Sequence, residues 1–256
     1  MNFLFAAVFY MLFQFGIYWP GPAVPQSNSN NITVVEYDCA TETGGAGCTQ
    51  TFTSSATSAK VTLGTATTSG EAIVVITLGG AGGSAYGSVT DSGSQTYTQD
   101  ATVKKTGVSG HYDFTVWYVC GSASGITYVT WTFGSGDAAV YSTMLVAHAK
   151  GVATSSCRDV AANFPSSAAS TPFSSSSVTT TYANEWLVGP VFANPSSYAT
   201  MTGTGNFTAE LNAENANGQT MAWLDGIVTA TGSYDTTGTG SVSGSYYYPA
   251  IVTFHH

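Results

Sequence analysis

The chain contains a histidine and a carboxylate, His111 and Asp113, at a spacing that could support acid–base chemistry. Residues i and i+2 of a β-strand share a face, so the carboxylate of Asp113 could orient the imidazole of His111. A base of this kind also needs a nucleophile. The sequence has no G-x-S-x-G motif that would single out one of its many serines. We therefore predict no catalytic residue at this pair.

Two further acidic groups raise the possibility of glycoside hydrolysis. Glu210 and Glu214 lie near the end of one predicted strand, and Glu185 stands beside Trp186, as an acid beside an aromatic platform would. A glycosidase needs two carboxylates that face each other across a cleft, roughly 5–10 Å apart, and neither spacing establishes such a pair. We predict instead a strand-edge glutamate followed by a core tryptophan.

Cation and phosphate sites are also poorly supported. Asp91 and Asp100 flank SGSQTYTQ in a segment that resembles a β-hairpin, and their oxygens could hold calcium, but the EF-hand pattern is absent. Aspartate before Ser-Gly commonly caps a turn, which is the role we predict for Asp91. The glycine-rich GGAGGSAYG at 79–87 lacks the lysine of a phosphate-binding loop. The sequence thus predicts no metal and no cofactor, and the terminal His255 and His256 are assigned neither.

Charge is scarce in this chain. Charged residues make up 7% of the sequence, against roughly 25% in ordinary globular proteins, and the formal net charge is −9. Only five residues are basic, too few to neutralise a row of phosphates, so nucleic acid is excluded as a partner. Ser, Thr, Gly, Ala and Asn take the surface positions of Lys and Glu, a pattern typical of exported proteins.

Four cysteines, Cys39, Cys48, Cys120 and Cys157, are candidates for two disulfides. An even count behind an apolar leader favours disulfides in an oxidising compartment, and no C-x-x-C motif or nearby histidine completes a zinc site. Cys39 and Cys48 bracket a turn-rich loop, which leaves Cys120 with Cys157 as the second pair. Four cysteines allow three pairings, and the sequence alone leaves the others open.

Residues 1–19 are apolar apart from Asn2, Gln14 and Gly16, and no charged residue occurs before Glu36. As a helix they would rise about 28 Å, close to the thickness of a bilayer core, with Phe5, Phe9 and Phe13 in one stripe. Three interpretations stay open: a secretion signal, a retained membrane anchor, or an assembly segment buried against neighbouring subunits. Residues 20–31, rich in Pro, Ser and Asn, are interpreted as a linker.

The remaining residues, 32–256, are interpreted as one all-β domain. Helix-forming residues are sparse while Gly and β-branched residues abound, which favours strands. Strands are predicted at 32–38, 71–78, 111–120, 126–133, 139–149, 185–193, 206–213, 219–230 and 247–254. Short strands separated by turn residues indicate an antiparallel β-sandwich of jelly-roll or immunoglobulin-like type.

Two segments of the sequence are similar to each other. TTSGEAIVV at 67–75 and TTYANEWLV at 180–188 share two threonines, a short turn, a glutamate and an apolar strand, with one residue of offset. Both could simply be Thr-rich turns before strands. We favour a weak repeat in which Glu71 and Glu185 open equivalent central strands in two halves of the sandwich.

The sequence offers candidate sites both for attached glycans and for a bound sugar. Asn31 and Asn206 each begin an N-x-[ST] sequon and are acceptors if the host glycosylates asparagine. The five tryptophans and the tyrosines at 246–248 could also stack on a bound sugar. At this density, however, aromatic residues of a sandwich are mostly core.

Three segments carry a resemblance: SVTDSGSQTYT (88–98), TTTYANEWLVGPVF (179–192) and IVTATGSYDTTGTGSVSGSYYYPAIVTF (227–254). Together they resemble a pattern of secreted, acidobacterial-type surface proteins and some phage-like proteins, in which a VTDSAGNTY-type hairpin, an ANELLVG-type strand and a closing strand ending in Ala-x-x-x-Phe recur in one β-sandwich. The resemblance covers roughly residues 60–254 and implies no catalytic residue. The cysteine pairs and the apolar leader are not part of this pattern.

These observations predict a non-enzymatic structural or adhesive protein, extracellular or at the cell surface. A charge-poor surface offers little repulsion between copies, and residues 1–19 offer an apolar segment for a neighbour to bury. We therefore expect self-association, in a filament or surface layer, as the main interaction, and membrane contact only through residues 1–19. The alternatives are a carbohydrate-binding module, which needs aromatics aligned on an exposed face, and a polysaccharide hydrolase, which needs converging carboxylates.

Overall fold

The computed structural model describes residues 31–80, 86–108, 112–134, 138–165, 169–194 and 198–256. Within these ranges all regular elements are β-strands, which confirms the predicted all-β class. The described residues include no helix that is long and apolar enough to cross a membrane. The apolar segment 1–19 with Phe5, Phe9 and Phe13, and the linker up to residue 30, lie outside the described residues.

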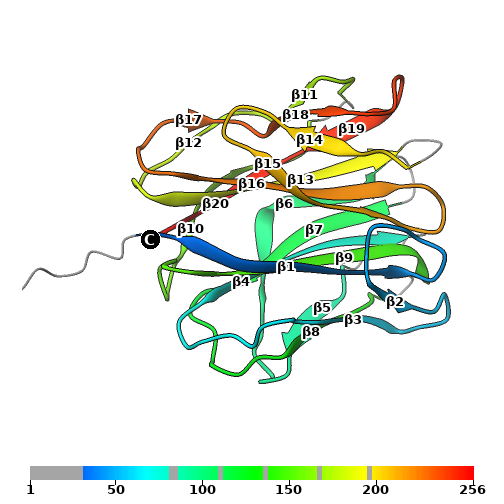
Figure 1. Cartoon of the computed structure of the whole chain (residues 1–256), viewed down its shortest axis with the longest axis horizontal. Helices are drawn as coiled ribbons and strands as arrows, with labels where there is room; N and C mark the ends of the chain where they lie inside the picture. Colours follow the sequence, from blue (N-terminus) through cyan, green and yellow to red (C-terminus); the bar gives the residue numbers. More distant parts are fainter. Residues whose placement is uncertain (1–30, 81–85, 109–111, 135–137, 166–168, 195–197) are drawn as a thin grey trace, which may run out of the picture.

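Two large sheets form the middle of the molecule (Figure 1). The first has the order β2-β1-β9-β4-β7-β6, and its strands are β2 (Gln50–Phe52), β1 (Thr33–Glu42), β9 (Ala138–Lys150), β4 (Ala72–Gly80), β7 (Tyr112–Val119) and β6 (Thr98–Val108). The second has the order β10-β20-β13-β16-β15, with β19 also paired to β13, and its strands are β10 (Arg158–Ala162), β20 (Ile251–His255), β13 (Glu185–Asn194), β16 (Thr220–Val228), β15 (Thr208–Glu214) and β19 (Tyr246–Pro249). The strand pairs are antiparallel except β1 with β2.

Smaller sheets cover the outer faces of the two large ones. The sheet β3-β8-β5 is built from β3 (Ser58–Thr62), β8 (Tyr128–Thr132) and β5 (Ser88–Asp91). On the other side lie β11-β18-β14 and β12-β17, which are built from β11 (Phe173–Ser174), β18 (Thr237–Gly240), β14 (Met201–Gly203), β12 (Val178–Thr179) and β17 (Ser233–Tyr234). Figure 1 shows the resulting stack of layers, with β3, β5 and β8 at the bottom and β11, β14 and β18 at the top.

Three apolar cores separate these layers, because the central strands are buried on both faces. In β4, Val74 and Ile76 point into the core between the two large sheets, whereas Ile73 and Val75 point into the core under β3, β5 and β8. In β13, Trp186 enters the middle core, together with Trp223 and Phe254. Its neighbour Leu187 enters the third core, beneath the small sheets of the second half. Burial on both faces explains the continuous apolar run at 71–78.

The large sheets repeat one topology. Without β2 and β19, each large sheet has five strands, which we number one to five by their order in the chain. Across both sheets these strands lie in the order 1-5-2-4-3. The corresponding strands, in chain order, are therefore β1, β4, β6, β7 and β9 in the first sheet and β10, β13, β15, β16 and β20 in the second. The outer sheets follow the same rule, since β3-β8-β5 corresponds to β11-β18-β14. We call residues 33–150 the first half and 158–255 the second half. The prediction that Glu71 and Glu185 open equivalent central strands is confirmed.

The nine predicted strands occur close to their expected positions, but one predicted pairing is wrong. The segment around Asp91 and Asp100 is not a β-hairpin, because β5 pairs with β8 while β6 pairs with β7. The chain crosses from an outer sheet to a large sheet at this point. Tyr97, which lies in the connection, is buried in the core between these two layers, and this burial separates the strands that would otherwise pair.

Candidate functional site

Carboxylates are the groups most able to do chemistry in this chain, and many of those that the structure describes are buried. Of the fourteen acidic residues, seven are no more than 6% exposed: Glu42, Glu71, Asp91, Asp100, Asp113, Glu185 and Asp225. Several accept bonds from nearby backbone amides. Asp91 Oδ1 accepts from Gly93 (2.8 Å) and Gln95 (3.1 Å), which confirms its predicted turn-capping role. Asp100 Oδ1 accepts from Thr102 and Val103, each at 2.7 Å.

The most concentrated group of ionisable side chains surrounds His148, which is fully buried on β9. Its Nδ1 lies 2.5 Å from Glu71 Oε2, at the start of β4, and its Nε2 lies 3.0 Å from Glu36 Oε1, on β1. Thr68 donates to Glu71 Oε1 from its amide (3.0 Å) and its hydroxyl (2.5 Å). The amide of Thr65 donates to Glu36 Oε2 (2.8 Å). Three adjacent strands thus place a carboxylate on either side of one imidazole.

This arrangement holds charge in place and leaves the histidine no free nitrogen. An imidazole can donate to two carboxylates at once only in its positively charged form, and this is the form that the two contacts favour. Burial alone would raise the pKa of Glu71, but the hydrogen bonds from Thr68 and His148 lower it overall. The hydroxyl of Thr68 donates to Glu71 rather than to His148, so no hydroxyl is activated by the imidazole. We interpret the group as a buried ion-pair cluster that fastens β1, β9 and β4 together.

The predicted candidate Glu185 is fully buried at the start of β13. Its Oε1 accepts from the amide of Tyr182 (3.2 Å), and its Oε2 has no hydrogen-bond partner among protein donors. Burial and the neighbouring carboxylate of Asp159 raise the pKa of Glu185 to about 7. Its neighbour Trp186 is fully buried, so it offers no exposed stacking surface. The predicted core position of Trp186 is confirmed.

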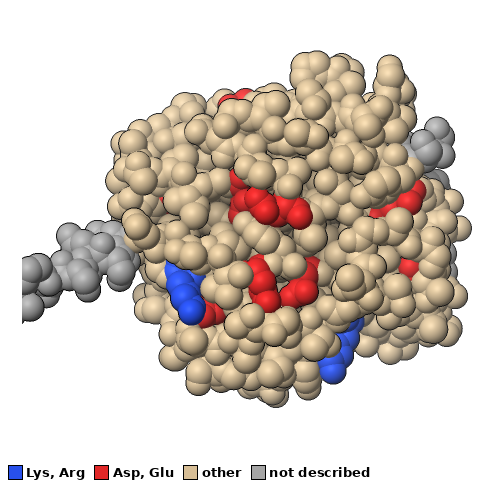
Figure 2. Space-filling view, in the orientation of Figure 1, with Lys and Arg blue, Asp and Glu red and all other residues tan. Residues whose placement is uncertain are grey.

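A second acidic centre, at Asp225 on β16, joins the two halves. Tyr37 of β1 donates its hydroxyl to Asp225 Oδ2 (2.6 Å), and Trp186 donates its indole N–H to the same oxygen (2.6 Å). Burial and the negative charge of Glu210 raise the pKa of Asp225 to about 6, although the bonds from Tyr37 and Trp186 oppose this. Figure 2 shows acidic side chains near the middle of this face, over β1 and over β15–β16.

The proposed partner of Glu210 was Glu214, and the structure does not bring these two together. Both lie on β15, four residues apart, which separates their backbones by roughly 13 Å along an extended strand. Glu210 lies instead at the bulge between Ala209 and Leu211, and its negative charge raises the pKa of Asp225 on the paired strand β16. Asp225 is 5% exposed and its Oδ2 already accepts two short hydrogen bonds, so this carboxylate contributes to the contact between the halves.

The bond between Tyr37 and Asp225 gives a testable contribution to stability. Tyr37→Phe is expected to lower the free energy of unfolding by about 1–3 kcal/mol at pH 8, because the ionised, buried carboxylate loses a donor. Tyr234→Phe is the matched control, since the hydroxyl of Tyr234 donates to the exposed carbonyl of Ala230, and about 0.5 kcal/mol or less is expected there. Urea unfolding measures both variants. Equal losses would show that the contact contributes nothing special.

The other candidates are scattered. His111 lies outside the described residues, and Asp113 is buried in β7 at 4% exposure. Asp100 is bound by Arg158, whose Nε lies 3.0 Å from Asp100 Oδ2. Within the described ranges, no group of three or more His, Cys, Asp or Glu side chains is arranged to hold a metal ion. His255 and His256 pack against the end of the fold, with His255 Nε2 donating to the carbonyl of Ser156 (2.9 Å).

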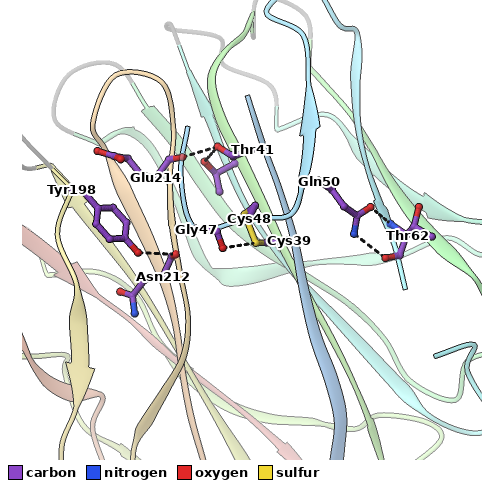
Figure 3. The surroundings of a disulfide bond; sticks show 10 residues. Cys39, Thr41, Gly47, Cys48, Gln50, Thr62, Tyr198, Asn212 and Glu214 are labelled. Carbon is purple, nitrogen blue, oxygen red and sulfur yellow. Dashed lines mark hydrogen bonds between the residues drawn. A yellow bond between two sulfur atoms is a disulfide. The ribbon is translucent and has the colours of Figure 1, made fainter. Parts of the chain in front are cut away.

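The structure has two disulfides, and they join the pairs that the loop spacing favoured. Cys39–Cys48 closes the loop that follows β1 (Figure 3). This loop reaches the second half, where Ala46 and Glu214 exchange two backbone bonds of 3.0 and 2.8 Å. Gly47, at φ +83°, fits against the backbone of Asn212, and a Cβ there would meet the Asn212 carbonyl. Cys120–Cys157 links the end of β7 to the start of β10, and so ties the first half to the second.

The sequons and the exposed aromatics are distributed over the surface. Asn31 and Asn206 are both exposed, Asn206 in the turn between β14 and β15. The exposed tyrosines of the described residues are Tyr182, Tyr198 and Tyr246. Tyr182 precedes β13 and Tyr246 pairs with its last residue, Asn194. A strand of ten residues separates them by roughly 30 Å, so these two do not form one stacking platform.

Sequence reasoning missed His148, Asp159, Tyr37 and Asp225 as partners in clusters. His148 sits inside an apolar strand run, and a buried charge in such a run is the one signal that could have drawn attention to it. Comparison with protein-family models, with curated proteins and with solved structures gives no match.

Proposed function

We propose that this chain is a non-enzymatic structural or adhesive protein of the cell exterior, whose copies contact one another in a filament or surface layer. The observation that carries the proposal is that His148 and four of the buried carboxylates are bound by partners within the fold. Glu71, Asp91, Asp100 and Asp225 each accept at least two short hydrogen bonds from the chain itself. Groups used in this way fasten strands and are not poised to bind a substrate.

The character of the surface supports contact between copies. Only five Lys and Arg residues occur in the chain, and Figure 2 shows a face on which charged side chains are few. Because charged residues make up 7% of the sequence, copies can meet over faces that carry few of them, and salt screens the net charge of −9. Hydroxyl and amide side chains can form hydrogen bonds across a contact without the cost of desolvating ions. We propose that residues 1–19 supply the apolar part of that contact.

The covalent and topological features fit an exterior location. Two disulfides persist in oxidising compartments and are rare where thiols are kept reduced. The finer fold that we propose is a jelly roll in each half, because eight main strands of each half divide between two packed sheets with a shared strand order. Three cores between four layers give a rigid unit, which suits a structural role.

The proposal is tested by the assembly state of the full chain. We expect ordered filaments or sheets in electron micrographs of the purified protein, and their loss in a variant with Phe5, Phe9 and Phe13 replaced by serine. Loss is expected because the variant removes the aromatic stripe that neighbouring copies would bury. The matched control replaces Asn2 and Gln14 of the same segment by serine and should assemble normally.

Retained thermal unfolding of each variant shows that residues 32–256 are still folded. Monomers from the unaltered chain at all concentrations, or assembly that is indifferent to the three phenylalanines, would contradict the proposal. Hydrolysis of a polysaccharide that depends on Asp225 or Glu210 would contradict its non-enzymatic part.

A further inference from the structure

Each half places a pair of carboxylates at the same point of its large sheet. In the first half the pair is Glu36 on β1 and Glu71 before β4, on either side of β9. In the second half the pair is Asp159 on β10 and Glu185 on β13, on either side of β20. Because β1, β4 and β9 correspond to β10, β13 and β20, the two pairs occupy equivalent positions.

The local structure of the two glutamates is also the same. A backbone amide three residues earlier donates to each carboxylate, from Thr68 to Glu71 at 3.0 Å and from Tyr182 to Glu185 at 3.2 Å. The residue directly before each glutamate has a positive φ, +90° at Gly70 and +59° at Asn184. The equivalence therefore extends from the sheet order to the individual turn.

The residue between the carboxylates differs between the halves. In the first half, His148 pairs with Ile73, two residues after Glu71, and binds both carboxylates. In the second half, the residue that pairs with Leu187, two after Glu185, is Thr253. Thr253 is fully buried and its hydroxyl accepts from the amide of Val160 (3.2 Å). A hydroxyl carries no charge, so the residue between the carboxylates of the second pair cannot balance them as His148 balances the first.

Glu185 shows the consequence directly. Its Oε2 is buried without a protein donor, although Asp159 lies close enough to act on it. Glu185 is buried and Asp159 is half-buried, and two carboxylates in contact repel each other unless one of them holds a proton. A proton on Glu185 supplies the missing donor for Oε2 and turns the repulsion into a hydrogen bond to Asp159.

Groups from three elements surround the pair. From β20, Thr253 lowers the pKa of Glu185 and so opposes the larger effect of burial, and His255 lies opposite Glu185 in the pairing register. The ring nitrogens of His255 lie near the carbonyl oxygens of His256 (2.8 Å) and Ser156 (2.9 Å), and His255 contributes to lowering the pKa of Asp159. From β16 the paired residue is the apolar Val228. The amide of Thr181 donates to Asp159 Oδ2 (2.6 Å), which favours the ionised form of Asp159.

We propose that the second half contains a proton-dependent fastening, in which Asp159 and Glu185 share one proton across β20, whereas the first half uses His148 at the equivalent position. With the proton in place, the pair holds β10 to the start of β13. Without it, two adjacent negative charges push β10 away from the sheet. The proposed structural function does not depend on this fastening.

The direction of the pH dependence follows from the ionisation of the pair. The pKa of Glu185 is raised from 4.5 to about 7, chiefly by burial and also by Asp159. The folded chain therefore binds more protons than the unfolded chain between these values. Stability is highest below this interval and falls as the pH rises through it. The first half behaves oppositely, since the pKa of Glu71 is lowered overall.

Glu185→Gln tests the proposal. The amide of glutamine keeps the acceptor for Tyr182 and supplies a permanent donor toward Asp159, as the shared proton does. At pH 8.5 the unfolding constant of the variant is expected to be on the order of 10–100-fold smaller than that of the unaltered chain. At pH 5 the two constants should agree within about threefold. Urea unfolding at both pH values gives these constants, and amide exchange of Thr181 and Tyr182 reports the local opening.

Glu71→Gln is the matched control at the equivalent position. It removes a counter-ion of His148, so it should destabilise the chain at pH 8.5 and not stabilise it. If Glu185→Gln fails to fold, Asp159→Asn serves the same purpose, because its amide can donate to Glu185 while its oxygen accepts from Thr181. Stability curves of the variant and the unaltered chain that run parallel from pH 5 to 8.5 would overturn the proposal, as would stabilisation by both glutamine variants.

Discussion

Replacement of His148 by threonine is expected to lower the free energy of unfolding by about 3–5 kcal/mol at pH 8, because it leaves Glu36 and Glu71 facing each other without their cation. His148 is fully buried, and its ring bonds both carboxylates at 2.5 and 3.0 Å. Threonine is the residue at the equivalent position of the second half, Thr253, so the variant gives the first half the chemistry of the second.

The pH dependence of this loss separates charge from packing. A cavity left by the smaller side chain costs the same at every pH, whereas repulsion between the carboxylates disappears once one of them takes up a proton. The loss in His148→Thr should therefore shrink as the pH falls from 8 to 5. In the unaltered chain the contribution of Glu71, whose pKa is lowered from 4.5, should persist over this range and be lost only as the pH falls below 4.5. A loss that is constant across this range would show that packing alone is at stake.

Much of the fold could be predicted from local patterns in the sequence. The run at 71–78 is mostly apolar because β4 is covered on both faces, and the predicted boundaries lie within two residues of those of the strand, Ala72–Gly80. The Cys39–Cys48 bridge was favoured because a short turn-rich segment separates the two residues. The similarity of the segments around Glu71 and Glu185 could be recognised because two strands that begin with the same turn have the same kinds of residue there. These features depend on neighbours in sequence.

Features that depend on distant strands could not be predicted in this way. Tyr37 and Asp225 are 188 residues apart and meet only because the two large sheets stack. Asp159 lies in none of the predicted strands, yet it belongs to β10 and acts on Glu185 across β20. The pairing of β5 with β8 rather than β6 likewise follows from the burial of Tyr97 between layers. Register between sheets is set by side-chain packing, and no local spacing encodes it.

The comparison of the halves also explains why the candidate site is structural. In each half the turn before the central strand has backbone amides that need acceptors. A glutamate accepts from one of them in both halves, and a second carboxylate, two strands away in the sheet, accepts from an amide earlier in the same connection, Thr65 at Glu36 and Thr181 at Asp159. Each half thus has a pair of carboxylates because its turn needs acceptors. The first pair is bound by His148, and we propose that the second shares a proton.

The covalent link between the halves carries the second large expected effect. Replacement of both Cys120 and Cys157 by serine should lower the free energy of unfolding by about 4 kcal/mol, because the unfolded chain regains the freedom of a loop with a sequence separation of 37. Replacement of Cys39 and Cys48, with a separation of 9, should cost about 3 kcal/mol by the same reasoning. Urea unfolding under oxidising conditions measures both.

The order of the two losses is the informative result. The link between Cys120 and Cys157 joins the end of β7 to the start of β10, so its removal also frees the strand that carries Asp159. Its loss should therefore exceed that of the Cys39–Cys48 pair, and the excess should grow from pH 5 to 8.5 as Asp159 and Glu185 lose their shared proton. A larger loss for the shorter loop would mean that its contact with Glu214 outweighs the chain-entropy difference. An excess that does not change with pH would show that β10 is held independently of the acid pair.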